Sequence, residues 1–442
     1  MSQKFIVVFV SVLFNGLQIL AQRNLLQSGP MVGYSAMKEV GLWVQTTESA
    51  TVYFIYFDKE NPVQRFKTSS LITVKENAFV AQIIAEVQPS KKYQYELYIN
   101  GKKINRPYPL EFQSQILWRW RAEPPSFKFA FGSCNYVNEI EVDRAGAPYG
   151  NDFQIYTSIL NRKPDFMIWG GDNIYLREVD WDTRTGILHR NTHTRSFPGL
   201  QALLASVHHY AIWDDHDFGP NDADRSYTLK RNTLEAFKLF WMNPSYTFEN
   251  EGITGSFVWG DAEFFLMDDR YFRSPNNSNF GEVAFFGEKQ VQWLLDALKS
   301  SIATFKFVVC GGQIINTEPH HENYAKYQTE RQRLLQAIQS ENIPGVLFLT
   351  GDRHYTELSK MERAGSYPLY DFTVSPLTSG ASGERYIDEK NQWRVPGTYF
   401  GNRNFCIFEI SGKSKARVLK ATVFDTHGKE IWTREISENE LK

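Results

Sequence analysis

Four short motifs place side chains that can bind metals directly after apolar runs of the sequence. The motifs are Gly132-Ser133-Cys134-Asn135, Gly170-Gly171-Asp172-Asn173-Ile174-Tyr175, Trp213-Asp214-Asp215-His216-Asp217 and Gly351-Asp352-Arg353-His354. A Gly-Asp pair after a strand is often only a turn. Four such motifs, each after its own apolar run, indicate one shared site.

The side chains in these motifs favour two kinds of cation. Adjacent carboxylates such as Asp214, Asp215 and Asp217 repel one another unless a cation or solvent compensates their charge. The motifs also supply a thiol, a phenol and an imidazole, but not the His-Glu-x-x-His pattern of zinc proteases. This mixture suits a transition metal beside a harder cation that prefers oxygen ligands.

The elements that must position these motifs alternate between strand and helix after Glu123-Pro124-Pro125. We expect strands at 127–131, 165–169, 209–213, 305–309 and 345–349, and helices at 152–161, 228–242, 289–298 and 331–339. This alternation predicts a sheet covered by helices. Ligands of such folds gather beyond the carboxyl ends of the strands, where the four motifs lie. His189, Arg190, His193 and Arg195, between the second and third motifs, face either an anionic substrate or solvent.

The region from residue 32 to 112 has a different pattern. Short strands rich in Val, Tyr, Phe and Ile are expected at 40–46, 50–57, 79–87 and 92–99, with turn residues between them. This spacing predicts an antiparallel β-sandwich. The region has no cluster of His, Cys or paired acids, so we assign it a structural or positioning role.

Composition and the first residues bear on location and partners. The 442-residue chain has 48 Lys+Arg and 50 Asp+Glu, a net charge of −2, so no nucleic-acid-binding surface is evident. Its three cysteines are too few, and odd in number, for a disulfide scaffold. Lys4, an apolar run at 5–14 and Ala21 predict a signal peptide at 1–21. A membrane anchor is the alternative, but this run is shorter than the roughly 20 residues needed to span a bilayer. We therefore expect a periplasmic or extracellular protein without stable membrane insertion.

The four motifs, in this order, resemble the alkaline phosphatase D (PhoD-like) family of calcineurin-type metallophosphoesterases. The resemblance covers residues 127–432, and the β-region before it resembles that family's immunoglobulin-like domain. It implies an α/β fold, a four-layer α/β/β/α sandwich at 125–436, preceded by a small all-β domain at 28–120. The general metallophosphoesterase pattern has an acid where this chain has Cys134 and a histidine where it has Asp352; both substitutions are PhoD-like.

The resemblance also implies a metal site. Its metal ligands would be Cys134, Asp172, Tyr175, Asp215, Asp352 and His354. Cys134, Asp172, Tyr175 and His354 would hold an iron(III)-like ion. Asp172 would bridge to a calcium site completed by Asp215 and Asp352, although other divalent metals also suit these ligands.

Further residues are candidates for contact with substrate or metal. His216 resembles the histidine that contacts phosphate and protonates the leaving group, and Arg270 is the second catalytic candidate. Asn221, Asp222 and Gln313 are additional candidates for metal or substrate contact.

These residues predict a secreted, metal-dependent hydrolase of phosphate esters that uses metal-activated water. Whether its substrates are phosphomonoesters or phosphodiesters stays open. The alternative is a non-catalytic secreted calcium-binding protein that docks a polysaccharide or a protein partner. Since calcium sites use oxygen ligands, His216, His354 and Cys134 favour the enzyme.

Overall fold

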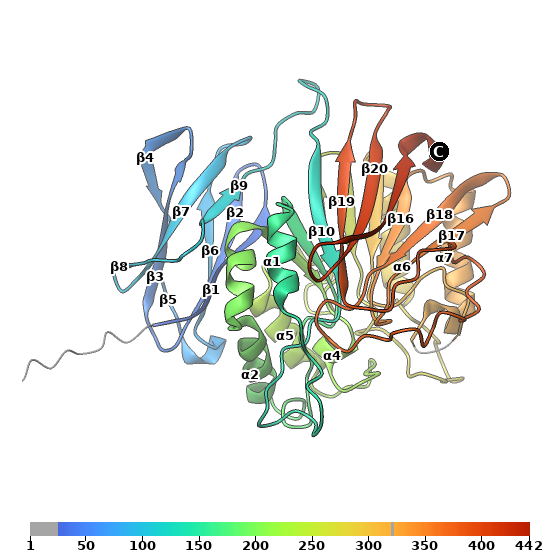
Figure 1. Ribbon diagram of the computed structural model, residues 1–442, viewed down its shortest axis with the longest axis horizontal. Helices are drawn as coiled ribbons and strands as arrows, with labels where there is room; N and C mark the ends of the chain where they lie inside the picture. The colour runs from blue at the N-terminus through green and yellow to red at the C-terminus, as the bar shows by residue number, and fades with distance from the viewer. Residues whose placement is uncertain (1–24, 320–321) are drawn as a thin grey trace, which may run out of the picture.

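Two large β-sheets face each other in the computed structural model, which describes residues 25–319 and 322–442 (Figure 1). The signal peptide expected at 1–21 lies outside the described residues. The first sheet has nine strands in the order β21 (Glu430–Ser437), β20 (Val418–Asp425), β19 (Asn404–Ser411), β10 (Phe127–Gly132), β11 (Phe166–Gly170), β12 (His208–Ile212), β1 (Leu26–Ser35), β2 (Glu39–Thr46) and β6 (Val80–Glu86). The second has six, in the order β13 (Gly255–Trp259), β14 (Ala262–Leu266), β15 (Phe305–Val309), β16 (Val346–Thr350), β18 (Ser366–Thr373) and β17 (Glu357–Arg363).

Aromatic side chains fill the space between these two sheets. The ring of Phe129 on β10 stacks on Phe166 and Phe408 of its own sheet. It also meets Phe264 and Phe307 of the second sheet edge-on, with ring centroids 5.1 and 5.4 Å apart. These fully buried rings form the centre of the core, and strands β10, β11 and β12 are buried on both faces except at Lys128.

Helices cover the outer faces of both sheets. On the first sheet lie α1 (Gln154–Asn161), α2 (Arg184–Arg195), α3 (Gln201–Ser206) and α5 (Lys230–Phe240). On the second lie α6 (Glu288–Ser300) and α7 (Gln328–Ser340), with Trp293 of α6 packed on Phe265 of β14 (Figure 1). The predicted four-layer α/β/β/α architecture is confirmed. No helix within the described ranges is long and apolar enough to cross a membrane.

The N-terminal region forms a sandwich that shares a sheet with the rest of the chain. A third sheet has the order β4 (Asn61–Lys67), β3 (Thr51–Asp58), β7 (Lys92–Ile99) and β8 (Lys102–Ile104), with β5 (Leu71–Ile72) paired to β3 and β9 (Glu111–Gln113) paired to β7. It packs on β1, β2 and β6 through a core of its own. Because β1 pairs in parallel with β12, through Val32 and His208, one sheet crosses the expected boundary between the segments 28–120 and 125–436.

His208 also ties these segments together through its imidazole. Its Nδ1 donates to the carbonyl of Gly33 at 2.7 Å, and its Nε2 accepts from the backbone N–H of Gln113 at 3.1 Å. The bond to Gln113 requires the neutral ring, because a protonated Nε2 cannot accept a hydrogen bond. Burial correspondingly lowers the pKa of His208 to about 4.

Candidate metal centre

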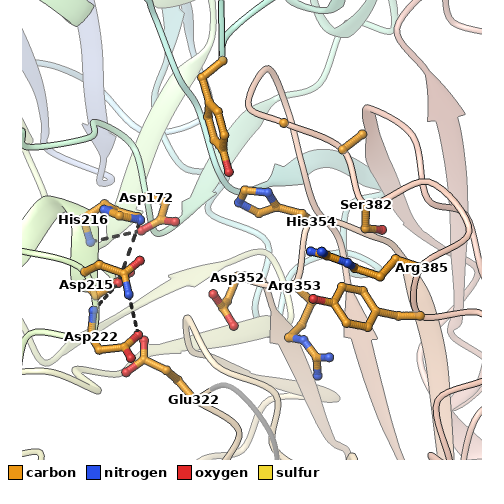
Figure 2. A pocket seen from close by; sticks show the side chains of 15 residues that line it. Asp172, Asp215, His216, Asp222, Glu322, Asp352, Arg353, His354, Ser382 and Arg385 are labelled. Carbon is orange, nitrogen blue, oxygen red and sulfur yellow. Dashed lines mark hydrogen bonds and ion pairs between the residues drawn. The ribbon is translucent and has the colours of Figure 1, made fainter. Parts of the chain in front are cut away.

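The four sequence motifs meet at one edge of the facing sheets. β10, β11 and β12 run parallel in close register, with Gly132 beside Trp169 and Gly170 beside Ile212. The loops after these strands and the loop after β16 line a cavity of about 540 Å³ (Figure 2). The motif side chains that line it include Asp172, Asp215, His216, Asp352 and His354.

Four expected metal ligands have left-handed backbone conformations. The φ angles are 58° at Cys134, 53° at Asp172, 65° at Asp352 and 56° at His354. Such residues cost about 1–3 kcal/mol each, persist only where the surroundings hold them, and cluster at functional sites. These loops therefore hold their side chains in fixed positions around the cavity.

Gly171 shows how Asp172 reaches its position. Its φ is +94°, and a Cβ added there would lie 2.7 Å from the Cβ of Asp214 and 3.1 Å from its backbone nitrogen. Only glycine allows the loop after β11 to lie this close to the loop after β12. This approach brings Asp172 beside the acidic motif.

Cys134, Asp172 and His354 form the first group of potential ligands. Their donor atoms lie within 4.8 Å of one another, with the Cys134 Sγ 3.6 Å from Oδ2 of Asp172. The Tyr175 hydroxyl lies 3.3 Å from Nε2 of His354 and adds a phenol to this group. The thiol, the carboxylate and the phenol are almost completely buried.

Two further groups follow, of which one shares Asp172 with the first group and the other shares Asp215 with the second. Asp172, Asp215 and His216 form one, and Asp214, Asp215 and Glu322 form the other, each with donor atoms within 4.8 Å. Both groups are rich in oxygen, the ligand type that calcium prefers. The structure thus brings together a mixed-donor position and an oxygen-rich position that share Asp172.

Burial disfavours the ionised forms of Asp172 and Asp352, whereas His216 and Arg270 keep the pKa of Asp215 low, at about 2. Burial and the nearby carboxylates of Asp215 and Asp214 raise the pKa of Asp172 well above its usual range. Burial and Glu322 raise the pKa of Asp352 to about 7. Burial likewise raises the pKa of Cys134. A bound cation reverses this preference by favouring the anionic forms.

Two buried atoms at the site lack a hydrogen-bond partner within the described part of the chain. They are Oδ2 of Asp214 and Nδ1 of His216. Burial lowers the pKa of His354 to about 4, so its imidazole is neutral, the form that binds metals. Buried oxygen and nitrogen atoms without partners, crowded carboxylates and a neutral imidazole are the features expected of a site for metal ions.

The structure also brings His216, Asn221 and Asp222 to the cavity. The His216 ring lies 4.3 Å from the Tyr175 ring, centroid to centroid. The Asp222 backbone N–H donates to Oδ2 of Asp215 at 2.8 Å, and the Asn221 amide donates to Asp222 at 2.9 Å. Asn221 and Asp222 are exposed at the rim beside the oxygen-rich group.

Arg270 is not brought to the cavity, contrary to the expectation that it contacts substrate. Its side chain is completely buried, where Nε donates to Oδ1 of Asp214 at 2.6 Å and Nη1 donates to Oε1 of Glu322 at 2.8 Å. Nη2 is ion-paired with both carboxylates. From this buried position, Arg270 neutralises Asp214 and Glu322 of the oxygen-rich group.

Gln313 likewise lies behind the site. Its amide donates to Glu357 and Thr373, and its carbonyl oxygen accepts from Nη1 of Arg353 at 2.7 Å and from Asn316. It is completely buried. Its position suits it to hold Arg353 rather than to contact substrate or metal.

Among the cavity residues that escaped the sequence reasoning, three have large polar side chains outside the motifs and their neighbours: Glu322, Tyr149 and Arg385. None follows an apolar run in the way the four motifs do. The one local signal was at Glu322, which stands in a short polar stretch rich in acids and histidines. Folding alone brings these three side chains to the cavity.

Sequence comparison matches residues 129–405 to the family model described as PhoD-like phosphatase. Alkaline phosphatase D of Bacillus subtilis (strain 168) is 24% identical over 360 residues, covering 67% of this chain. The matched region spans 58% of that relative's own length.

Two solved structures share the fold. The structure of PhoD superposes with a TM-score of 0.75 at 18% identity, over 94% of this chain and 93% of that chain. Purple acid phosphatase PPD1 from yellow lupin seeds superposes with a TM-score of 0.66 at 11% identity, over 93% of this chain and 74% of that chain. At these identities the likeness concerns the fold.

Proposed function

Because the chain belongs to the PhoD-like phosphatase family, we propose that it is a secreted, metal-dependent hydrolase of phosphate esters. Its substrates are phosphomonoesters, phosphodiesters or both. The observation that carries this proposal is the junction of a Cys/Asp/His group with two carboxylate-rich groups on one cavity. Secretion rests on the signal-like pattern at 1–21.

The proposed ligands fall into two sets. Cys134, Asp172, Tyr175 and His354 would hold an iron(III)-like ion, because thiolate, phenolate and imidazole suit a transition metal. The second ion, calcium or another divalent metal, would be held by oxygen atoms of Asp172 and Asp215, whose donor atoms cluster, and of Asp352, which lies outside the clustered groups but lines the same cavity. Glu322 clusters with Asp215. When bound, such a pair polarises a phosphoryl oxygen and lowers the pKa of bound water.

His216 is the proposed proton donor to the leaving-group oxygen. It lines the cavity, its Nε2 lies 4.0 Å from Oδ2 of Asp215, and its Nδ1 has no partner within the described residues. Burial lowers the pKa of His216, while the Asp215 carboxylate opposes that shift. The Asp215 carboxylate favours the protonated imidazole, which is the form that donates a proton to a departing ester oxygen.

A panel of esters tests the proposal. Purified protein is assayed with 4-nitrophenyl phosphate and bis(4-nitrophenyl) phosphate while its metals are measured by elemental analysis. We expect turnover of at least one ester, loss of turnover on chelation, and recovery when metals are returned. Calcium-dependent stability without turnover of either ester would instead favour the non-catalytic calcium-binding protein.

A further inference from the structure

The cavity wall across from the carboxylate groups is formed by part of residues 380–394, which we call the strap. Figure 2 shows Ser382 and Arg385 of the strap on one side of the cavity, and Asp172, Asp215 and His216 on the other. The strap lies outside the four sequence motifs, and none of its residues is among the proposed metal ligands. Its side chains therefore add chemistry that the proposed metal ligands do not supply.

The strap is held in place by bonds to the metal-ligand loop. The Ser382 backbone N–H donates to the carbonyl of His354 at 2.9 Å. At the other end of the strap, Glu389 accepts from Nη2 of Arg353 at 2.6 Å, in an ion pair whose side chains are 1% and 7% exposed. These two anchors hold the backbone between them beside the cavity.

Arg385 lies between the anchors and has a free guanidinium. Its side chain points into the cavity (Figure 2) and lines it. Within residues 25–319 and 322–442, its guanidinium has no hydrogen bond or ion pair, only a contact of 5.9 Å with the Tyr386 ring. Arg353 and Arg270, by contrast, are fully engaged with Gln313, Glu389 and the buried acids.

The cavity is larger than the group that the metals would bind. Its volume of about 540 Å³ falls in the range of sites for whole small molecules. If the transferred phosphoryl group lies against Asp172, Asp215 and Asp352, the alcohol part of the ester extends toward the strap. A guanidinium there presents a planar fork of donors that matches a carboxylate or a phosphate.

We infer that the alcohol part of the substrate carries a second anionic group, and that Arg385 binds it. The inference rests on the proposed function, because the metal ligands define where the first phosphoryl group lies. The shared chemistry is a pair of anionic oxygens, from either a carboxylate or a second phosphate. Arg385 is then a residue that selects the substrate, not one that acts on the reacting atoms.

Matched esters test this inference. 2-Phosphoglycerate and glycerol 2-phosphate differ only in a carboxylate against a hydroxymethyl group; fructose 1,6-bisphosphate and fructose 6-phosphate form the pair for a second phosphate. We expect Arg385→Gln to lower kcat/KM about tenfold for 2-phosphoglycerate, for fructose 1,6-bisphosphate or for both, the members that carry the second anionic group. Its kcat/KM for the matched partner should stay within about twofold. Lys390→Gln, an exposed strap residue that does not line the cavity, is the control.

The results distinguish a failure of the inference about Arg385 from a failure of the proposed function. Equal losses for both members of each pair would place Arg385 on the transferred phosphoryl group and overturn the inference. Unchanged kinetics for every ester would also overturn it, with the proposed function intact. If the wild-type protein hydrolyses none of these esters or the nitrophenyl esters, the proposed function fails and the inference fails with it.

Discussion

Replacing Arg270 by alanine should destabilise the fold, because this arginine compensates buried acids. The substitution leaves the carboxylates of Asp214 and Glu322 buried without their counterion. Removing one partner of a buried ion pair costs about 3–5 kcal/mol. At about 2.1 cal/mol/K per residue, 442 residues have an unfolding entropy of about 0.9 kcal/mol/K, so the midpoint of thermal unfolding should fall by about 3–5 °C.

Thermal unfolding followed by circular dichroism measures this change, with Asp214→Asn and the double variant Asp214→Asn/Arg270→Ala completing a double-mutant cycle. The double variant removes a carboxylate together with the guanidinium, so its loss should be smaller than the sum of the single losses by about 1 kcal/mol or more. An Arg270→Ala protein with wild-type thermal stability and a reduced kcat would refute this reasoning. That result would return Arg270 to the substrate contact expected from the sequence.

Three further predictions concern other parts of the molecule. Since burial lowers the pKa of His208 to about 4, against about 6.5 in the unfolded chain, the unfolded state binds more protons between these values. Stability should therefore drop by about 3 kcal/mol as the pH falls from 7 to 4, and urea unfolding of His208→Asn should lack this component; parallel pH profiles of the two proteins would contradict the assignment. Glu389→Gln breaks the pair with Arg353 and should speed tryptic cleavage within the strap, whereas an unchanged cleavage rate would show that the pair does not hold it. Iron(III) bound by Tyr175 should give a visible charge-transfer band that weakens in Tyr175→Phe, and a colourless, iron-free, active enzyme would exclude iron.

The strand-end motifs were readable from sequence because their information is local. A run of apolar residues followed by Gly-Asp or Trp-Asp-Asp-His specifies a buried strand and the loop after it. The helices expected at 152–161 and 289–298 correspond to α1 and α6, because their apolar periodicity is strong.

Other features depend on contacts between distant segments, which the sequence does not display. Glu322 and Arg385 reach the cavity from loops whose positions are fixed by packing. The charged stretch that holds Arg190 and Arg195 was expected to face substrate or solvent. Both side chains are instead buried in α2, Arg190 against Asp180 and Arg195 on the ring of Trp241 at 3.8 Å. Because α2 is rich in polar residues, its sequence did not indicate that these two arginine side chains are buried.

The nine-stranded sheet is a second feature that depends on contacts between distant segments. The alternation between residues 32 and 112 predicts strands and a sandwich but does not identify their partners. The pairing of β1 with β12 is set by a contact about 175 residues apart in the chain, as the bond between Gly33 and His208 shows. The N-terminal strands thereby extend the same sheet whose β10, β11 and β12 loops line the cavity.

The central claim is that a metal centre organised around Asp172 performs hydrolysis. Metal content and turnover of 4-nitrophenyl phosphate, measured together in wild-type protein, Asp172→Ala and the exposed control Asp296→Ala on α6, test it most directly. The account predicts that wild type and Asp296→Ala contain metal and turn over, while a folded Asp172→Ala loses both. A folded Asp172→Ala protein that keeps full turnover would contradict the account.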